Sequence, residues 1–395
     1  MSDIPLSQRV QKIKASPTLV VTARAAELQA QGKDIISLGA GEPDFDTPRF
    51  IKDAAIAAIN GGFTKYTPVG GTPELKQAVI DKFTRENGLD YIPQQILVSV
   101  GAKQSFYNLV QALINPGDEV IIPAPYWVSY LDIVLLAEGV PVVVTAGHDQ
   151  EFKITPDQLS DAITSRTRLV VLNSPSNPTG AVYSAAELRA LGEVLLSHPH
   201  VIVASDDIYE HILWTPEPFC NILNVCPDLY GQTVVMNGVS KAYAMTGWRI
   251  GYAGGPQPLI SAMAKVQSQS TSNPASISQA AARAALEGDQ SCVKEMCEVF
   301  KQRHDFVVQA LNGIPGVECV PSQGTFYSFP AMHKVIEFLD FIDDDVELAE
   351  YFLEKAGVAL VPGSAFGMPG YMRLSYATHM DDLEKATARI REALE

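Results

Sequence analysis

The sequence predicts an α/β fold. Through most of its 395 residues, short apolar runs alternate with longer segments of helical character. Residues 96–100 form a nearly continuous apolar run, as expected for a strand buried on both faces, and a small-residue turn and a helical segment follow it. The length suits two or three domains, or one large and one small domain. Because 47% of the residues are hydrophobic and 19% are charged, the composition fits a soluble globular protein with a sizeable core.

The expected elements follow this alternation from the N-terminus to residue 180. A polar arm precedes the first helix, which Gly32 should end because glycine readily adopts the left-handed backbone found after many helices. The next strand, from residue 35, breaks at Gly39, Gly41 and Pro43. A third glycine is missing and Pro43 forbids a regular helix start, which argues against a dinucleotide-binding fingerprint. Helices are expected over 18–31, 48–62, 104–113, 128–138 and 156–162, and strands over 96–100, 119–122, 140–145 and 168–172.

The second half of the chain continues in the same manner. Asp343, Asp344 and Asp345 form an acidic helix start, because carboxylates are favourable near a helix N-terminus. Helices are expected over 185–196, 259–286, 291–313, 346–355 and 381–394, and strands over 201–204, 233–236, 317–320, 326–329 and 372–376.

Charge and cysteine content narrow the class of function. The formal net charge of −16 argues against a nucleic-acid surface, which would show a basic patch. The cysteines have no metal-ligand spacing, so we expect free thiols in a reducing compartment and no metal site; they are Cys220, Cys226, Cys292, Cys297 and Cys319. Residues 1–13 do not resemble a signal peptide, and no apolar run approaches the roughly 18 residues of a membrane span. We therefore expect a cytoplasmic protein without membrane contact.

The strand over 233–236 leads into a small polar turn that carries Ser240 and Lys241, and a second apolar run then carries Arg249. A lysine between two strand-like runs should be partly buried. Desolvation lowers the pKa of a lysine, and an unprotonated amine can attack a carbonyl group. The alternative is a surface lysine that reaches solvent along its own side chain.

Gly101, Ala102 and Lys103 form a turn between a strand and a helix N-terminus. Free backbone N–H groups and the helix dipole both favour an anion there. Any strand–helix unit has such a turn, so the signal is weak alone. Together with Lys241 and Arg249 it indicates a phosphate site.

Two further charged residues lie at or within apolar strands. Asp206 ends one of them, at the sheet edge where α/β proteins place their ligands. The neighbouring Asp207 is interpreted as a helix cap. Arg373 lies inside an apolar strand and must find an anion or stay exposed, and its forked guanidinium suits a carboxylate.

Three motifs resemble those of class I aminotransferases. The first is Ser240-Lys241, with Arg249-Ile250-Gly251 beginning eight positions after the lysine. The second runs over 173–180 and reads Asn-x-x-x-Asn-Pro-Thr-Gly, and the third is Gly-Glu-Pro-Asp-Phe over 41–45. The similarity extends over residues 14–376, nearly the whole chain.

This resemblance implies the cofactor pyridoxal 5′-phosphate (PLP), with Lys241 as the catalytic residue that forms a Schiff base with it. A protonated pyridine ring acts as the electron sink of this cofactor. Arg249 would hold the phosphate, Asp206 would keep the pyridine nitrogen protonated, and Asn177 would bind the phenolic oxygen. The implied cofactor-binding set is Tyr66, Gly101, Ala102, Lys103, Trp127, Asn177, Asp206, Tyr209, Ser240, Lys241 and Arg249, in which Trp127 stacks on the ring and Tyr209 keeps the family's spacing to Asp206.

The resemblance also implies a fold-type I PLP-dependent transferase. Its large domain, over 48–288, would hold a mixed, mostly parallel sheet. A smaller α+β domain would combine 15–47 with 289–395, after an arm over 1–14. Tyr66 would reach the cofactor phosphate of a neighbouring subunit, which implies a homodimer with shared active sites.

Within the family, the chain is most similar to the bacterial aspartate aminotransferase subgroup Ib, some of whose members also use prephenate. This implies ping-pong transamination between aspartate or glutamate and a 2-oxo acid. Arg373 would bind the α-carboxylate and Lys103 the distal carboxylate. Thr18 would shape the acidic pocket, and Lys14 is associated with prephenate use. The implied substrate-binding set is Lys14, Thr18, Gly41, Lys103, Trp127, Asn177 and Arg373.

Three alternatives remain open. The same cofactor residues occur in fold-type I decarboxylases, lyases and C–C-cleaving enzymes, and in aminotransferases of other specificity. Arg373 with a second reader of an acidic group favours transamination. A PLP-binding transcription regulator is disfavoured, because only about a dozen residues precede the motif region and the chain is acidic.

Overall fold

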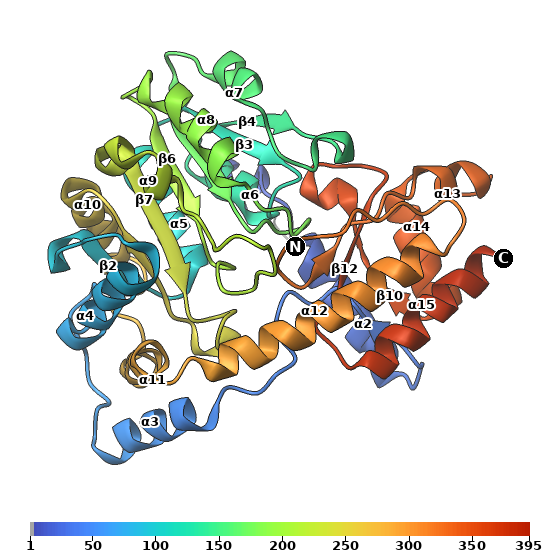
Figure 1. Cartoon of the computed structure of the whole chain (residues 1–395), viewed down its shortest axis with the longest axis horizontal. Coiled ribbons are helices and arrows are strands. Elements are labelled where there is room, and N and C mark those ends of the chain that lie inside the picture. The colour runs from blue at the N-terminus through green and yellow to red at the C-terminus, as the bar shows by residue number, and fades with distance from the viewer. Residues whose placement is uncertain (1–3) are drawn as a thin grey trace.

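The computed structural model describes residues 4–395 and shows two lobes (Figure 1). The large lobe is a seven-stranded sheet with the helices packed on it. The small lobe contains two small sheets and receives both the N-terminal segment and the C-terminal part of the chain. The long helix α12 (Ser291–Asn312) runs from the large lobe along the small one. Within the described residues, no helix is both long and apolar enough to cross a membrane.

The large sheet has the strand order β2-β8-β7-β6-β5-β3-β4. All neighbours pair in parallel except β8, which is antiparallel to both β2 and β7. The expected mixed, mostly parallel sheet is therefore confirmed. Its strands are β2 (Ile96–Ser99), β3 (Glu119–Ala124), β4 (Val140–Thr145), β5 (Thr167–Asn173), β6 (Ile202–Asp206), β7 (Thr233–Gly238) and β8 (Gly251–Gly254).

Both faces of this sheet are covered, which explains its continuous apolar strands. Along β5, Leu169 and Val171 point into one core, whereas Val170 and Leu172 point into the other. A strand alternates its side chains between faces, so burial of both faces requires apolar residues at every position. One face packs on α5 (Ala102–Leu113), α6 (Ser129–Leu136) and α10 (Gln257–Ser268), and the other on α4 (Pro73–Lys82), α7 (Pro156–Ala162), α8 (Ala185–Leu196), α9 (Ile222–Val225) and α11 (Ser276–Glu287).

In the small lobe, distant parts of the chain pair with one another. Strand β1 (Ile36–Ser37) lies parallel to β10 (Val358–Ala359), and β12 (Met372–Ser375) lies between β11 (Val361–Pro362) and β9 (Tyr327–Ser328). A separate apolar core fills this lobe. Its helices are α2 (Pro17–Ala30), α12, α13 (His333–Phe338), α14 (Asp345–Tyr351) and α15 (Met380–Leu394), while α1 (Gln8–Gln11) is a single exposed turn and α3 (Arg49–Asn60) packs on α11.

Several expected elements differ in the structure. The helix expected over 259–286 is two helices, α10 and α11, because the linker between them contains Pro274, which cannot continue a helix. The strand expected over 317–320 is reduced to a single bridge between Glu318 and Ala331. The helix expected over 346–355 is α14 followed by a π-helical turn, and α4 was not expected. The acidic helix start is confirmed, since the Asp344 carboxylate accepts from two backbone N–H groups of α14.

Candidate active site

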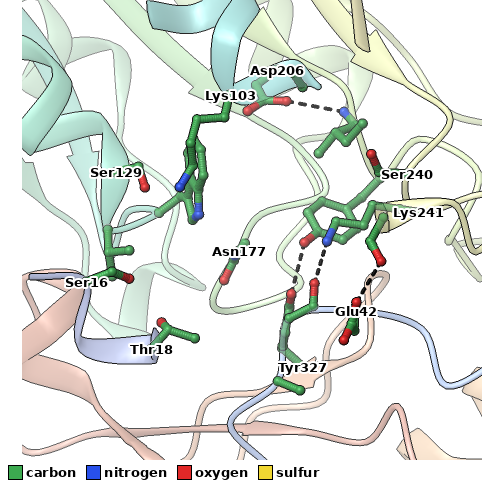
Figure 2. Close-up of a pocket in the computed structure, with 18 of the residues that line it drawn as sticks. Ser16, Thr18, Glu42, Lys103, Ser129, Asn177, Asp206, Ser240, Lys241 and Tyr327 are labelled. Carbon is green, nitrogen blue, oxygen red and sulfur yellow. Dashed lines mark hydrogen bonds between the residues drawn. The ribbon is translucent and has the colours of Figure 1, made fainter. Parts of the chain in front are cut away.

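A cavity of about 420 Å³ lies where the carboxyl ends of β5, β6 and β7 face the small lobe. It brings together side chains from both lobes and from the first turns of α2 (Figure 2). Twelve of the predicted site residues line it, namely Thr18, Gly41, Ala102, Lys103, Trp127, Asn177, Asp206, Tyr209, Ser240, Lys241, Arg249 and Arg373.

Lys241 follows β7 and extends into this cavity. Its Nζ donates to the carbonyl oxygen of Gly41 and lies 5.7 Å from the ring centroids of both Tyr209 and Phe326. Burial, reinforced by the positive charge of Arg373, lowers the pKa of Lys241 to about 8. The amine is thus available as a nucleophile or base near neutral pH.

Asp206 ends β6 and is almost fully buried. The hydroxyl of Tyr130 donates to Oδ2 at 2.5 Å, and the backbone N–H of Ile208 donates to Oδ1 at 3.4 Å. Burial raises the pKa of Asp206, although the hydrogen bonds and Lys241 oppose this shift. A buried carboxylate in a ligand cavity suits a bound group that carries an N–H.

The loop after β6 is held by a buried polar network. Glu210 accepts from Lys82 Nζ, from Asn87 Nδ2 at 2.7 Å and from Asn237 Nδ2 at 2.7 Å. These partners come from α4, the turn after it and β7. The network fixes the backbone that carries Asp206 into the cavity.

Asp207 is not a helix cap, contrary to our interpretation. Its buried carboxylate accepts from Ser205 Oγ at 2.7 Å and from Asn221 Nδ2, and no helix begins there. Burial and the nearby Glu210 raise the pKa of Asp207 to about 8. The Asp207 side chain therefore ties β6 to the start of α9, and it does not line the cavity.

The turn before α5 forms a close cradle with Arg249. Gly101 has φ +82°, and a Cβ there would lie 2.4 Å from Arg249 Nη2. A Cβ on Gly251 would lie 2.2 Å from the backbone nitrogen of Ala102. Side chains at these glycines would thus collide with the cradle. The exposed guanidinium beside a helix N-terminus makes an anion site, and Ser240 lines the same cavity.

Arg373 lies on β12 and is 2% exposed. Its Nη1 donates to Asn177 Oδ1 at 3.0 Å and its Nη2 to the Gly39 carbonyl at 2.7 Å, while its buried Nε has no hydrogen-bond partner within residues 4–395. The guanidinium also lies 4.5 Å from the Tyr327 ring centroid. Because a buried unpaired charge is costly, this arginine is prepared for an anion from outside the chain.

Lys103 lies on the opposite side of the cavity from Lys241 (Figure 2). Lys103 Nζ lies 5.0 Å from the ring centroid of Trp127, and Trp127 packs edge-on against Tyr130. The surrounding protein and the charge of Arg249 lower the pKa of Lys103. Thr18 reaches this side from α2.

Three predicted residues do not line the cavity. Gly101 precedes Ala102 in the chain, and of these two residues only Ala102 lines the cavity. Tyr66 is 93% exposed and does not line the cavity of its own chain. Lys14 lies in a neighbouring groove that Asp132 also lines. The roles of Tyr66 and Lys14 stay predictions.

Sequence reasoning missed several cavity residues. Tyr130 holds Asp206, Tyr327 bonds to Tyr209 with 3.0 Å between the hydroxyl oxygens, and Thr246 donates to Glu42. Tyr130 and Tyr327 lie in apolar segments, where aromatic residues most often serve the core. Glu42 lies inside a motif that we quoted, and this position was the available signal.

Comparisons with known proteins agree with this geometry. The family model "Aminotransferase class I and II" matches residues 33–390. An aspartate/prephenate aminotransferase of Nitrosomonas europaea is 62% identical over 98% of this chain and 99% of its own length. The crystal structure of the aspartate aminotransferase from Rhizobium meliloti superposes with a TM-score of 0.95 at 51% identity, over 99% of each chain. The Thermus thermophilus aspartate aminotransferase with maleate gives 0.93 at 44% identity, over 99% of this chain and 100% of that one. The chain belongs to the class I and II aminotransferase family.

Proposed function

We propose that this chain transfers amino groups between aspartate or glutamate and a 2-oxo acid, with PLP held at Lys241. One observation carries the proposal: Arg373 and Lys103, two cations that form no ion pair within residues 4–395, border the same cavity as Lys241. A dicarboxylic substrate would place one carboxylate on each cation. Relatives at 52% to 62% identity that are named aspartate or aspartate/prephenate aminotransferases support this substrate class.

The residues present fit PLP. Arg249 and the N-terminus of α5 would bind its phosphate in the cradle that Gly101 keeps open. Trp127 offers a flat face for the ring, and the Asp206 carboxylate would hold a proton on the ring nitrogen. When bound, PLP supplies the electron sink that makes the α-proton of an amino acid acidic.

The chain's own residues would orient the substrate and move its protons. Arg373 binds the α-carboxylate through its fork, and Lys103 binds the distal carboxylate. Lys241, with a pKa of about 8, takes the α-proton on its Nζ as a base and, as an acid, would deliver it to the bound cofactor. Burial of Arg373 and Asp206 keeps water away from their charges, which strengthens both contacts.

Prephenate is the second candidate substrate. The similar proteins of Nitrosomonas europaea and Cereibacter sphaeroides are both named aspartate/prephenate aminotransferases. Lys14 and Thr18 support the same reading, because the segment that carries them borders the cavity on the Lys103 side.

Self-association as a homodimer forms part of the proposal. Helix α3 and the loop after it expose Phe50, Ile56, Ile59 and Phe63 at 37% to 50% of their surfaces, and Tyr66 follows at 93%. An exposed apolar stripe of this kind is typical of an interface. Tyr66 would then complete the phosphate cradle of the second copy. Light scattering should give twice the mass of the chain.

The two lobes support a division into a large domain over 48–288 and a small domain that joins 15–47 to 289–395. The pairing of β1 with β10 supports this assignment, because it places the N-terminal segment in the C-terminal lobe. An arm over 1–14 would precede both domains, and its residues 1–3 lie outside the described part of the chain.

A half-reaction tests the proposal. The purified protein is converted to its pyridoxamine form with glutamate, freed of glutamate and mixed separately with oxaloacetate, prephenate or pyruvate. Recovery of the original absorbance reports amino transfer. Oxaloacetate should react much faster than pyruvate, which lacks the distal carboxylate, and rapid recovery with prephenate would add that substrate. Equal rates with oxaloacetate and pyruvate would contradict the role of Lys103 in binding the distal carboxylate.

A further inference from the structure

The segment from Gly39 to Thr47, here called the bridge segment, connects the lobes and contacts both functional cations. The Gly39 carbonyl accepts from Arg373 Nη2 at 2.7 Å, and the Gly41 carbonyl accepts from Lys241 Nζ. A shift of this backbone would therefore move the partners of the substrate arginine and of the catalytic lysine together.

The bridge segment is fastened at its far end. Thr47 donates to the Ala244 carbonyl at 2.7 Å and accepts from Trp248 Nε1 at 3.0 Å, so it is tied to the turn after Lys241. Asp44 forms two hydrogen bonds, at 2.7 and 2.9 Å, with Arg303 of α12. Next to Gly41, the bridge segment is fastened by the side chain of Glu42.

Glu42 lines the cavity on the side of Lys241, away from Lys103 (Figure 2). Its Oε2 accepts from Thr246 Oγ1 at 2.6 Å, which joins the bridge segment to the large lobe directly beside Gly41. The mechanism proposed above gives neither residue a task, although both line the cavity.

We propose that Glu42, held by Thr246, is a positioning residue that keeps the Gly41 carbonyl against the Lys241 amine and stabilises the protonated form of that amine. The inference rests on the proposed function, because it assigns Glu42 to the proton transfer of the same site.

The charges around Lys241 support this role. Two cations face it, Arg373 from β12 and Arg249 from the turn before β8, and two anions, Asp206 from β6 and Glu42 from the bridge segment. The rings of Tyr209 and Phe326, which also lie near the Lys241 amine, are uncharged near neutral pH. Without the Glu42 charge, two cations would face one anion. The protonated amine would then be less stable, and its pKa would fall.

Two variants separate the charge of Glu42 from its hydrogen bond. Glu42→Gln keeps an oxygen that can accept from Thr246 and removes the charge. Thr246→Val removes the hydroxyl that donates to Glu42, so the charge of Glu42 remains but loses this hydrogen bond. Glu42→Asp serves as the conservative control.

The readout is the pH dependence of Lys241 acetylation. Each holoenzyme is converted to the pyridoxamine form, in which Lys241 is free, and labelled with a trace of acetic anhydride across a pH series. Mass spectrometry quantifies the label on Lys241 against the exposed Lys33 of the same sample. The acidic limb of kcat/KM for the 2-oxo acid, which reacts with the pyridoxamine form, is measured against pH in parallel.

For Glu42→Gln we expect the pKa of Lys241 to fall by about half a unit to one unit, from the loss of one nearby charge. The acidic limb of kcat/KM should move to lower pH by the same amount. Thr246→Val should lower the Lys241 pKa and move the acidic limb of kcat/KM in the same direction by smaller amounts. Glu42→Asp, which keeps the charge, should leave both values close to those of the wild type. An unchanged Lys241 pKa in Glu42→Gln overturns the proposal, even if the melting temperature drops.

Failure of the proposed function would look different. Before conversion, Lys241 should be protected from acetylation in the wild-type holoenzyme. Equal labelling before and after conversion would refute the cofactor role of Lys241, whereas the comparison between wild type and Glu42→Gln would still report on Glu42.

Discussion

Two regions border the same cavity but are packed in opposite ways. The strands β6 and β7 are buried at nearly every position, and Asp206 and the Lys241 turn extend directly from them. The N-terminal segment over 4–30 exposes most of its side chains, and only Ala25 and Leu28 of α2 are buried. The groups proposed to act on every substrate thus sit on rigid strand ends. Lys14 and Thr18, which are proposed to meet only the substrate side chain, sit before or on the loosely packed α2, whereas Lys103 lies in the first turn of α5.

This contrast suggests a division of tasks. Strand ends held by sheet packing can keep a reacting group within a fraction of an ångström of its working position. A helix with few buried contacts can change its sequence at little cost in stability. Substitutions at strand ends should therefore reduce activity toward all substrates, and substitutions near α2 should change only selectivity.

The largest effect should come from Lys241→Ala. Loss of both the covalent attachment and the proton carrier should lower kcat by roughly 10⁴-fold or more for every substrate. After borohydride reduction, mass spectrometry should find the cofactor mass on the peptide that contains Lys241 in the wild type only. Near-normal activity in this variant would refute the proposed function.

The next largest effect should come from Asp206→Asn, for which Asp207→Asn at the adjacent position is the matched control. Loss of the Asp206 charge should lower kcat about 10²- to 10³-fold, because the ring nitrogen would lose its anionic partner. Asp207, with a pKa of about 8, is mostly protonated at pH 7, so the asparagine should retain most activity. Similar losses in both variants would show that the strand end, rather than the Asp206 charge, matters.

The pH profile should report Lys241. A base works only when unprotonated, and Lys241 is a free amine in the pyridoxamine form that reacts with the 2-oxo acid. The kcat/KM for the 2-oxo acid should therefore rise about tenfold per pH unit up to the Lys241 pKa of about 8 and level off above it. From pH 6 to pH 8 the increase should be about 50-fold. A flat profile between these values would argue against Lys241 as the base.

Lys103→Ala should separate substrates by their side chains. We expect kcat/KM to fall about 10- to 100-fold for aspartate and to change less than about threefold for alanine, because only the acidic substrate has a distal carboxylate. Lys33→Ala, at an exposed position outside the cavity, controls for the loss of a surface charge. Equal losses with both substrates would remove Lys103 from the specificity site.

Lys14→Ala should have the smallest effect of these variants. It is also the most direct test of the contrast between the strand ends and the N-terminal segment. Its side chain is exposed beside the cavity, so activity toward aspartate should stay within about twofold of the wild type. A selective loss with prephenate, measured as the ratio of kcat/KM values, would assign Lys14 to that substrate. A general loss would show that the arm supports the whole site.

Local motifs predicted much of the site. The strand–turn–helix unit indicated an anion site at Gly101 and Ala102, and the resemblance to class I aminotransferases supplied the expected phosphate role of Arg249, which lies against Gly101. Tyr130 was missed, because a buried tyrosine in an apolar helix looks like core until its hydroxyl is seen to reach Asp206. Asp207 was misread, because its partner Asn221 lies in an element with which no local pattern connects it.

By itself, the sequence determined the alternation of buried strands and helices, the strand–turn–helix unit at the start of α5 and the identity of the charged groups. These features depend on neighbours along the chain and on the period of the apolar pattern. Only the tertiary structure decided that Gly39 would meet Arg373, 334 residues away, and that Gly41 would meet Lys241, 200 residues away. Such contacts arise when two lobes bury separate cores and close a cavity between them, which depends on packing in three dimensions.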